Sequence, residues 1–321
     1  AWGIRTDSTA VDALVEDLEA DVTSALATLT EAGVYRDNGT KDMAAVRARV
    51  SAAYEDHPPL TDKGAVSTAR LVLEESGDEV LALLASIGAA QKLLSTYIPV
   101  LRAGTERPLN PRYNLVDSGR TSASGPNIQN VPRRGGVREA FIPREGNLFV
   151  ACDYAIAELS ALAQICVHRY GSSQMAQAIQ AGRDLHLHTG AGILGIGYVE
   201  MSTRFEAGDT EAKNARQLAK CLNFGLAGGL GSARFCQFAK ATYGLELTDA
   251  QAKQLKQTWL SSYPEMRHYF ADVSAALQYE GKFTAEQYKS GRRRGGLGFT
   301  DGCNTYFQGL VADLAKEAVY Y

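Results

Sequence analysis

The feature that most restricts the fold of this chain is a long apolar stripe near its N-terminus. The stripe repeats at spacings of three and four residues, which is the pattern of one face of an amphipathic helix. Asp7 or Ser8 is placed to cap the start of that helix. A polar connection over His57–Gly64 interrupts the pattern, and helical character returns from about Asp78 to Leu101. The members of the first stripe are Val11, Leu14, Val15, Leu18, Val22, Leu26 and Leu29.

The middle of the chain has a different character. From about Arg107, glycine and proline punctuate short segments, and Leu148–Cys152 is an apolar run that suits a buried strand. Helical patterns dominate again from about Ala157 to Ala276, and residues 281–301 predict turns or a hairpin. A last helix is expected to begin near Asn304 and to run to the end of the chain. This order of segments favours an α+β fold over alternating βαβ units.

Composition limits the class of protein. The 321 residues suffice for two or three compact units, and contents of 45% hydrophobic and 21% charged residues are typical of a globular protein. Five widely spaced cysteines without a C-x-x-C pair argue against a disulfide framework or a zinc site, and for a reducing compartment. The longest uncharged apolar run, Val80–Ala90, is too short to span a bilayer, so no membrane partner is expected.

The charge is unevenly distributed. A net charge of −3 gives no overall attraction to nucleic acid, but basic residues gather locally. Arg133, Arg134 and Arg138 lie in one short stretch, and residues 292–294 are consecutive arginines. Because a basic triplet is more often a solvated turn than a phosphate site, neither cluster indicates a function by itself.

Asp153 directly follows the apolar run over Leu148–Cys152. A carboxylate at the end of a buried strand is held rigidly and can face a cleft, which suits a hard cation such as Mg²⁺ that is shared with phosphates. The same residue could instead cap the helix that is expected to follow. The position in the sequence, taken alone, favours the capping role.

A second group combines positive charge with an aromatic ring. Arg216, Lys220 and Phe224 are spaced four residues apart, which places them on adjoining turns of one helical face. Two cations one turn apart would neutralise a triphosphate, and the ring could pack on a base or sugar. An ordinary amphipathic surface helix with a buried Phe explains the spacing equally well.

Further sequence stretches, in the order found in a known family, favour the functional interpretation of both groups over the structural one. With them, the chain resembles the polymerase region of family A, DNA polymerase I type, DNA polymerases, and looks closest to bacteriophage members. The resemblance runs from about Ala89 to Tyr321, and Lys92–Tyr97 resembles the thumb helix of the family. The stretches that carry it, besides those around Asp153 and Lys220, are Gly119–Ser122, Pro126–Asn130, Gly182–His186, and Asn304 with Gln308.

The resemblance implies a right-hand polymerase fold, with a helical thumb, an antiparallel-sheet palm and helical fingers. The thumb is expected over residues 1–105, the first part of the palm over 106–165, the fingers over 166–280, and a return to the palm over 281–321. The palm is expected to be incomplete, because family members carry a second metal-binding carboxylate in an H-D-E motif and no such triplet occurs here. Truncation, residues missing from the chain, or a split polymerase completed by a second polypeptide would each explain this.

The segment Asp153–Leu159 resembles motif A of the family, usually D-Y-S-Q-I-E-L. The resemblance implies that Asp153 binds two catalytic Mg²⁺ ions and that the backbone carbonyl of Tyr154 is a further ligand. Two such ions can activate a primer 3′-hydroxyl and stabilise the leaving pyrophosphate. Glu158 is implied to be the steric gate that excludes a ribose 2′-hydroxyl.

The helix that carries Lys220 resembles motif B. The resemblance implies that Arg216 and Lys220 hold the triphosphate of an incoming dNTP, as catalytic cations, and that Phe224 stacks near that nucleotide. His186 resembles the family histidine that reaches the triphosphate, with Asp184 in its supporting turn. The residues that resemble contacts to primer–template DNA are Arg120, Asn127, Arg138, Asn304 and Gln308.

One departure from the family concerns sugar selection. The family usually has a Tyr four residues after the motif B Phe, where it helps to hold the steric-gate Glu. This chain has Gly228 at that position, so Glu158 loses its usual partner and weaker ribonucleotide exclusion is expected. No exonuclease carboxylates precede the thumb, so no proofreading is expected.

The sequence therefore predicts a DNA-templated DNA polymerase in phage or plasmid replication, in the cytoplasm of a bacterial or phage-infected cell. The alternative is a non-catalytic primer–template-binding part of a split polymerase. A single-subunit RNA polymerase fits less well because of Glu158 and the Asn-Phe-Gly of motif B. A small-molecule phosphate enzyme would not need the groove contacts. The polymerase reading requires Asp153 and Lys220 to share one cleft.

Overall fold

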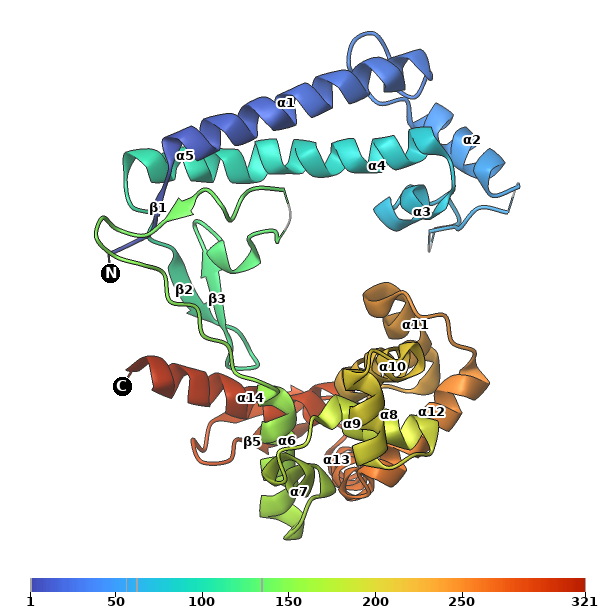
Figure 1. Cartoon of the computed structure of the whole chain (residues 1–321), viewed down its shortest axis with the longest axis vertical. Coiled ribbons are helices and arrows are strands. Elements are labelled where there is room, and N and C mark those ends of the chain that lie inside the picture. The colour runs from blue at the N-terminus through green and yellow to red at the C-terminus, as the bar shows by residue number, and fades with distance from the viewer. Residues whose placement is uncertain (1, 56, 62, 134, 321) are drawn as a thin grey trace. The chain divides into compact units, whose positions relative to one another are not determined.

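The computed structural model describes residues 2–55, 57–61, 63–133 and 135–320. They divide into two compact units, the first formed by Ala1–Asn114 with Ser122–Ala151 and the second by Leu115–Thr121 with Cys152–Tyr321. Both units are mainly helical, and the described residues add three two-stranded sheets (Figure 1). The architecture is α+β, as predicted.

The first unit is built on the helix that the apolar stripe predicts. Helix α1 (Ser8–Glu31) begins where Asp7 accepts a hydrogen bond from the backbone N–H of Ala10. Its apolar face packs along α4 (Glu79–Lys92) and α5 (Ile98–Glu106), and the helices lie side by side in Figure 1. The buried stripe forms part of two hydrophobic clusters, which include Val11, Val15, Leu18, Leu29, Leu81, Leu84 and Leu101.

Helices α4 and α5 are joined by a π-helical turn, η1 (Leu93–Tyr97), which the sequence did not predict. Such turns are rare and occur often at functional sites. The continuous helical run Glu79–Glu106 is, among the described residues, the one helix that is long and apolar enough to cross a membrane by length and composition. Helix α1 packs against this run, and Leu81, Leu84 and Leu101 are buried in the hydrophobic clusters of the unit.

Short elements complete the first unit. Strands β1 and β4 pair in antiparallel fashion, with Arg5 opposite Ile142. Strands β2 and β3 form a second two-stranded sheet. The bounds of these elements are β1 (Arg5–Thr6), α2 (Met43–Ala53), α3 (Arg70–Glu75), β2 (Arg112–Leu115), β3 (Thr121–Ser124), the 3₁₀ turn η2 (Ile128–Asn130) and β4 (Phe141–Ile142).

The second unit holds a succession of helices around one large hydrophobic cluster. Helix α10 packs closely against α8, and α14 packs against α6. The cluster includes the fully buried aromatic residues Phe235, Trp259, Tyr263 and Tyr269. The helices of this unit are α6 (Ala157–Tyr170), α7 (Gln174–Gln180), α8 (Leu185–Leu194), α9 (Tyr198–Glu206), α10 (Thr210–Ala227), α11 (Ser232–Tyr243), α12 (Asp249–Ser262), α13 (Glu265–Glu280) and α14 (Phe299–Tyr320).

The predicted hairpin over residues 281–301 is present. Strands β5 (Phe283–Glu286) and β6 (Arg293–Leu297) pair in antiparallel fashion, with a bulge after Phe283. The last helix, however, begins at Phe299 rather than near Asn304. Gly302 lies inside this helix, and the ring of Phe283 packs against it, because a Cβ atom at position 302 would lie 2.5 Å from the Phe283 Cζ.

The prediction of a buried strand over Leu148–Cys152 is wrong. The segment has no assigned secondary structure, and Leu148 is 88% exposed and Val150 86% exposed. A strand is stabilised by the backbone hydrogen bonds of a neighbouring strand. No strand among the described residues pairs with this segment, so its apolar residues stay in solvent.

Candidate nucleotide-binding site

The predicted triphosphate-binding residues lie on helix α10. Asp209 caps the helix by accepting a hydrogen bond from the backbone N–H of Ala212. The face that carries Ala212, Ala215 and Ala219 is buried, which leaves Arg216, Lys220 and Phe224 on a more accessible face. Phe224 is 41% exposed, so it is not the buried ring of an ordinary amphipathic helix.

Helix α8 brings two further predicted residues to the same place. Asp184 caps α8 through hydrogen bonds from the backbone N–H groups of His186 and Leu187 to its Oδ1 atom. Its Oδ2 atom accepts from Arg216, at 2.7 Å from Nη2 and 3.2 Å from Nε. The ring of His186 lies 5.5 Å from that of Phe224, measured between centroids. The structure therefore joins Asp184, His186, Arg216 and Phe224 in one cluster.

The two cations of this cluster differ in whether a carboxylate neutralises them. Burial acts to raise the pKa of Asp184, but hydrogen bonds from Arg216 and from the start of α8 outweigh it, so the pKa is lowered. Arg216 is thus an oriented and compensated cation, and it also lies over the ring of Phe205 at 5.1 Å. Lys220 forms no ion pair within the part of the chain that the structure describes. It is half-buried, and its charge is available to an anion.

His186 is neutral near pH 7. Its side chain is buried, which lowers its pKa to about 4 from the usual 6.5. Asp184 acts to raise that pKa, whereas Arg216 and Lys220 act to lower it further. An imidazole in this state can donate a hydrogen bond to a phosphate but adds no charge.

Asp153 lies in an exposed segment without secondary structure. It does not cap the helix that follows, because α6 begins after Ile156, which is in the left-handed conformation (φ 47°) and gives no side-chain cap. A β-branched residue adopts that conformation at a cost. The capping alternative for Asp153 is therefore excluded, and its shared cleft with Lys220 stays a prediction.

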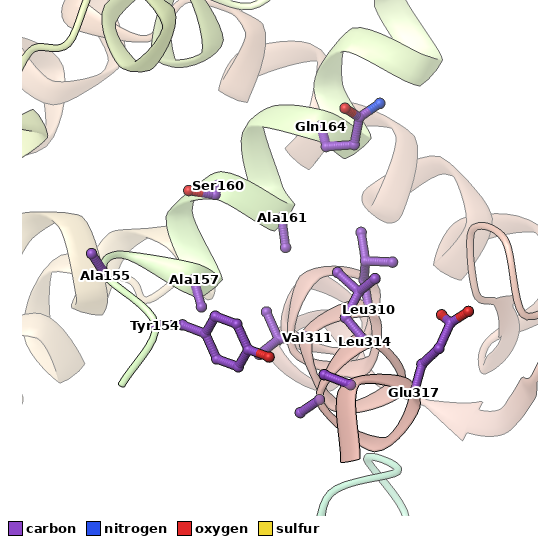
Figure 2. A pocket seen from close by; sticks show the side chains of 12 residues that line it. Tyr154, Ala155, Ala157, Ser160, Ala161, Gln164, Leu310, Val311, Leu314 and Glu317 are labelled. Carbon is purple, nitrogen blue, oxygen red and sulfur yellow. The ribbon is translucent and has the colours of Figure 1, made fainter. Parts of the chain in front are cut away.

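Tyr154 lies at an apolar pocket between α6 and α14. The pocket has a volume of about 620 Å³, and Figure 2 shows the Tyr154 ring beside Val311 of α14. Tyr154 is 62% exposed and Leu314 is 52% exposed. The side chain therefore takes part in an open apolar surface, and its predicted role as a metal ligand concerns only the backbone carbonyl.

Glu158 has a partner that the sequence did not reveal. Its Oε1 atom accepts a hydrogen bond from Nη2 of Arg120, and the two side chains form an ion pair. Position 228 is Gly, so the usual Tyr partner is absent, but Arg120 takes up the Glu158 carboxylate instead. Weaker ribonucleotide exclusion stays a prediction. Asn304 occupies the space beside Gly228, where a Cβ atom would lie 2.7 Å from Oδ1 of Asn304.

The other predicted DNA contacts are placed as follows. In the first unit, Asn127 caps η2 through the backbone N–H of Gln129, and Arg138 donates to the backbone carbonyls of Val131 and Pro132. In the second unit, Asn304 and Gln308 lie one turn apart on α14, with Gln308 Nε2 3.4 Å from Asn304 Oδ1. Arg134, of the basic stretch before Arg138, lies outside the described residues.

The three consecutive arginines make contacts within the second unit. Arg292 forms an ion pair with Asp313 of α14 and donates to the backbone carbonyl of Ser118. Arg293 pairs with Glu286 across the hairpin. Arg294 donates to the Thr305 hydroxyl at 2.7 Å. This basic run is thus largely committed to internal contacts.

Sequence reasoning missed a buried polar network beneath the cluster. Asn223 joins His186 to Thr189 and Trp259 through its side-chain amide, and Tyr263 contacts Thr189. Asn223 precedes Phe224 in motif B, but nothing in the spacing indicated that it is fully buried. Trp259 and Tyr263 lie more than thirty residues further along the chain, so no local pattern connects them to His186.

The described residues do not by themselves form a metal site. No group of three or more His, Cys, Asp or Glu side chains among them is arranged to hold an ion. Glu158 is engaged by Arg120, so Asp153 is the carboxylate of motif A that remains free of an ion pair within the described chain. One carboxylate and one carbonyl do not fit a two-ion centre.

The fold of the chain is that of a polymerase domain. The structure is similar to a solved structure described as the POL domain of Pol1 from M. smegmatis in complex with DNA primer-template and dNTP, with a TM-score of 0.73. The similarity covers 98% of this chain and 56% of that chain at 21% sequence identity, so it shows the fold.

The family follows from the sequence comparisons. A model of DNA polymerase family A matches residues 51–320, and the chain therefore belongs to DNA polymerase family A. It is 30% identical to DNA polymerase I of Aquifex aeolicus, over 81% of this chain and 43% of that protein. It is 28% identical to the thermostable DNA polymerase I of Thermus filiformis, over 83% of this chain and 31% of that protein. The chain thus spans less than half the length of these relatives.

Proposed function

We propose that this chain carries the nucleotide-gripping part of a DNA-templated DNA polymerase, which adds dNTPs to a DNA primer 3′ end and releases pyrophosphate. The thumb, palm and fingers are assigned to the residue ranges expected from the sequence. Its partners are primer–template DNA and dNTP. A role in phage or plasmid replication stays a prediction, since the two relatives named above are bacterial proteins.

The observation that carries this proposal is the cluster on α8 and α10. Five residues that the family pattern assigns to the triphosphate or its support come together from two segments about thirty residues apart. Arg216 is oriented by Asp184, while Lys220 keeps an uncompensated charge. Such preorganised donors are most effective when water is excluded. The five residues are Asp184, His186, Arg216, Lys220 and Phe224.

Each group of the cluster has a distinct task in this proposal. Lys220 and Arg216 neutralise the triphosphate, and His186 adds a neutral hydrogen-bond donor. The exposed ring of Phe224 offers a stacking surface to the nucleotide. The ion pair of Arg120 and Glu158 fixes the carboxylate that the family pattern assigns to sugar selection.

A second candidate function starts from the metal ligands that the described residues do offer. The described residues offer one free carboxylate of motif A and no three-ligand cluster. The chain would then bind primer–template and dNTP but act only together with a polypeptide that carries the H-D-E carboxylates. Asp153 would be the contribution of this chain to the shared Mg²⁺ centre.

Primer extension tests both candidates. The chain is assayed alone and together with a polypeptide that carries the H-D-E segment, with Mg²⁺ and all four dNTPs. Extension by the chain alone supports the first candidate, and extension only in the mixture supports the second. Asp153→Ala is expected to abolish extension, and Lys220→Ala to lower kcat/KM for dNTP by about 100-fold.

The matched control is Lys213→Ala, because Lys213 is an exposed lysine of the same helix, outside the cluster. It is expected to leave extension unchanged. Extension that survives Asp153→Ala would defeat the proposed mechanism. An equal loss in the two lysine variants would show that α10 contributes only general charge.

A further inference from the structure

In the buried network beneath the cluster, Trp259 determines which atoms donate and which accept hydrogen bonds. Its indole Nε1–H lies 2.9 Å from Oδ1 of Asn223. An indole N–H can only donate a hydrogen bond. The opposite orientation of the Asn223 amide would place its NH₂ group against that N–H. The amide therefore presents its oxygen to Trp259 and its NH₂ group to the other side.

The orientation of the Asn223 amide in turn determines which nitrogen of His186 carries the proton. The Nδ2 atom of Asn223 lies 3.0 Å from Nδ1 of His186 and 3.3 Å from the backbone carbonyl of Leu185. Because an amide NH₂ group donates, Nδ1 of His186 must accept and carries no proton. The proton of the neutral imidazole is then on Nε2.

The network leaves Asn223 little freedom to turn. Its Oδ1 atom also accepts from the Thr189 hydroxyl at 3.0 Å, and the Tyr263 hydroxyl contacts Thr189 at 3.0 Å. Asn223, Thr189 and Trp259 are each 0% exposed. Burial of so many polar groups is tolerated only when each finds a partner. A loose amide would leave at least one of them unpaired.

We propose that Asn223 is a positioning residue that holds His186 as the Nε2–H tautomer, so that a neutral N–H is offered to the triphosphate of the incoming nucleotide. The nucleotide part of this assignment rests on the proposed function, whereas the tautomer does not. Protonation of Nδ1 would set a second donor against the Asn223 amide. The charged groups that act on His186 are Asp184 of the α8 cap and Arg216 and Lys220 of α10.

Nitrogen NMR of the free protein tests the tautomer directly. With ¹⁵N-labelled histidine at pH 7, His186 is expected to show an unprotonated Nδ1 and a protonated Nε2, assigned with His186→Gln. A protonated Nδ1, alone or in an imidazolium ion, would overturn the proposal. This measurement on the unmodified chain needs neither DNA nor activity, so it is decided independently of polymerase function.

Two substitutions test the role of Asn223. Asn223→Asp replaces the donor by an acceptor and is expected to move the proton of His186 to Nδ1. Trp259→Phe adds no charge, frees the amide to turn and is expected to give a mixture of tautomers. His188, two residues further along α8, serves as the internal control, and its NMR signals should show an unchanged tautomer. An unchanged His186 tautomer in whichever of the two variants folds would overturn the assignment.

Nucleotide affinity connects the tautomer to the site. With primer–template, dNTP binding to Trp259→Phe is expected to weaken in proportion to the lost fraction of the Nε2–H tautomer, by about tenfold at most, which is the effect of losing one hydrogen bond to a charged group completely. Unchanged affinity in a variant with an altered tautomer would overturn the contact between Nε2–H and phosphate. Absence of dNTP binding to the unmodified chain would instead contradict the proposed function and leave the NMR result standing.

Discussion

At the scale of single residues, the two cations of the cluster differ: Arg216 is paired with a carboxylate, whereas Lys220 is free to bind an anion. Asp184 forms an ion pair with Arg216 and so neutralises its charge. Because Asp184 also caps α8, the guanidinium is held at the start of that helix. Lys220 has no such partner within the described chain. An arriving triphosphate would therefore gain most from Lys220, while Arg216 supplies a donor whose direction is already set.

The ion pair of Arg120 and Glu158 leads to a prediction about sugar selection. Arg120 is 47% exposed and Glu158 is 28% exposed, and a pair so open to solvent contributes about 1 kcal/mol at most. Arg120→Ala should therefore lower the preference for dNTP over rNTP by about fivefold or less, whereas Glu158→Ala should lower it further. The measurement is kcat/KM for both nucleotides.

The double variant distinguishes support from independent action. If Arg120 acts through Glu158, adding Arg120→Ala to Glu158→Ala changes the nucleotide preference no further. Arg120→Lys, which keeps the charge, should recover most of it. Full additivity of the two substitutions would show that Arg120 affects the sugar by another route.

The depressed pKa of His186 predicts how stability varies with pH. The unfolded chain binds a proton at this residue below about pH 6.5, and the folded chain only below about pH 4. The unfolded state therefore binds more protons between these values, and stability falls as pH falls through that window. Relative to His186→Gln, the free energy of unfolding should decline by up to about 3 kcal/mol.

Chemical denaturation at pH 7.5, 5.5 and 4 measures this difference. His188, whose pKa is also lowered by burial, remains in both proteins and so cancels in the comparison. The free energy of unfolding of the unmodified protein minus that of His186→Gln should be constant above about pH 6.5 and should fall steadily as the pH is lowered further. Parallel stability curves over the whole range would mean that His186 is not buried as a neutral group.

At the scale of elements, the second unit depends on a buried carboxylate between two helices. Glu265, at the start of α13, accepts hydrogen bonds from the Ser173 hydroxyl at 2.6 Å and from the backbone N–H of Met175 at 3.0 Å. Ser173 in turn caps α7 through Ala176. The second oxygen, Oε2, is buried without a hydrogen-bond partner among the described residues. Glu265 thus links α13 to the beginning of α7.

Substitution of Glu265 should separate the hydrogen bonds from the charge. Glu265→Ala leaves the Ser173 hydroxyl and the Met175 N–H unpaired, and is expected to cost about 2–4 kcal/mol of unfolding free energy. Glu265→Gln keeps one acceptor oxygen and should cost clearly less. Urea denaturation of the three proteins measures the order. A Gln variant as unstable as the Ala variant would show that the negative charge, rather than the hydrogen bonds, is required.

At the scale of the whole molecule, periodicity and local signals predicted much of the fold. The stripe from Val11 to Leu29 gave α1 with its Asp7 cap, and the spacing of Arg216, Lys220 and Phe224 gave their common face on α10. The hairpin of β5 and β6 lies in the segment over residues 281–301 that was predicted to form turns or a hairpin. These features depend on neighbours in sequence, which is why a pattern can reveal them.

The features that escaped prediction depend on distant partners. Leu148–Cys152 looked like a strand, but a strand also needs a neighbour, and the described residues provide none. Gly302 lies within α14 in close contact with Phe283, which is almost twenty residues earlier in the chain. The partners of Glu158 and His186, which are Arg120 and Asn223, lie 38 and 37 residues away along the chain. No spacing rule connects such pairs.

The central claim is that the cluster of α8 and α10 grips the triphosphate of an incoming nucleotide. Equilibrium binding of dNTP with Mg²⁺ and a dideoxy-terminated primer–template tests it most directly, because no chemistry can follow. We expect Lys220→Ala to weaken binding by about 100-fold and Lys213→Ala, on the same helix, to leave it unchanged. Equal affinity of the unmodified chain and Lys220→Ala would contradict the account.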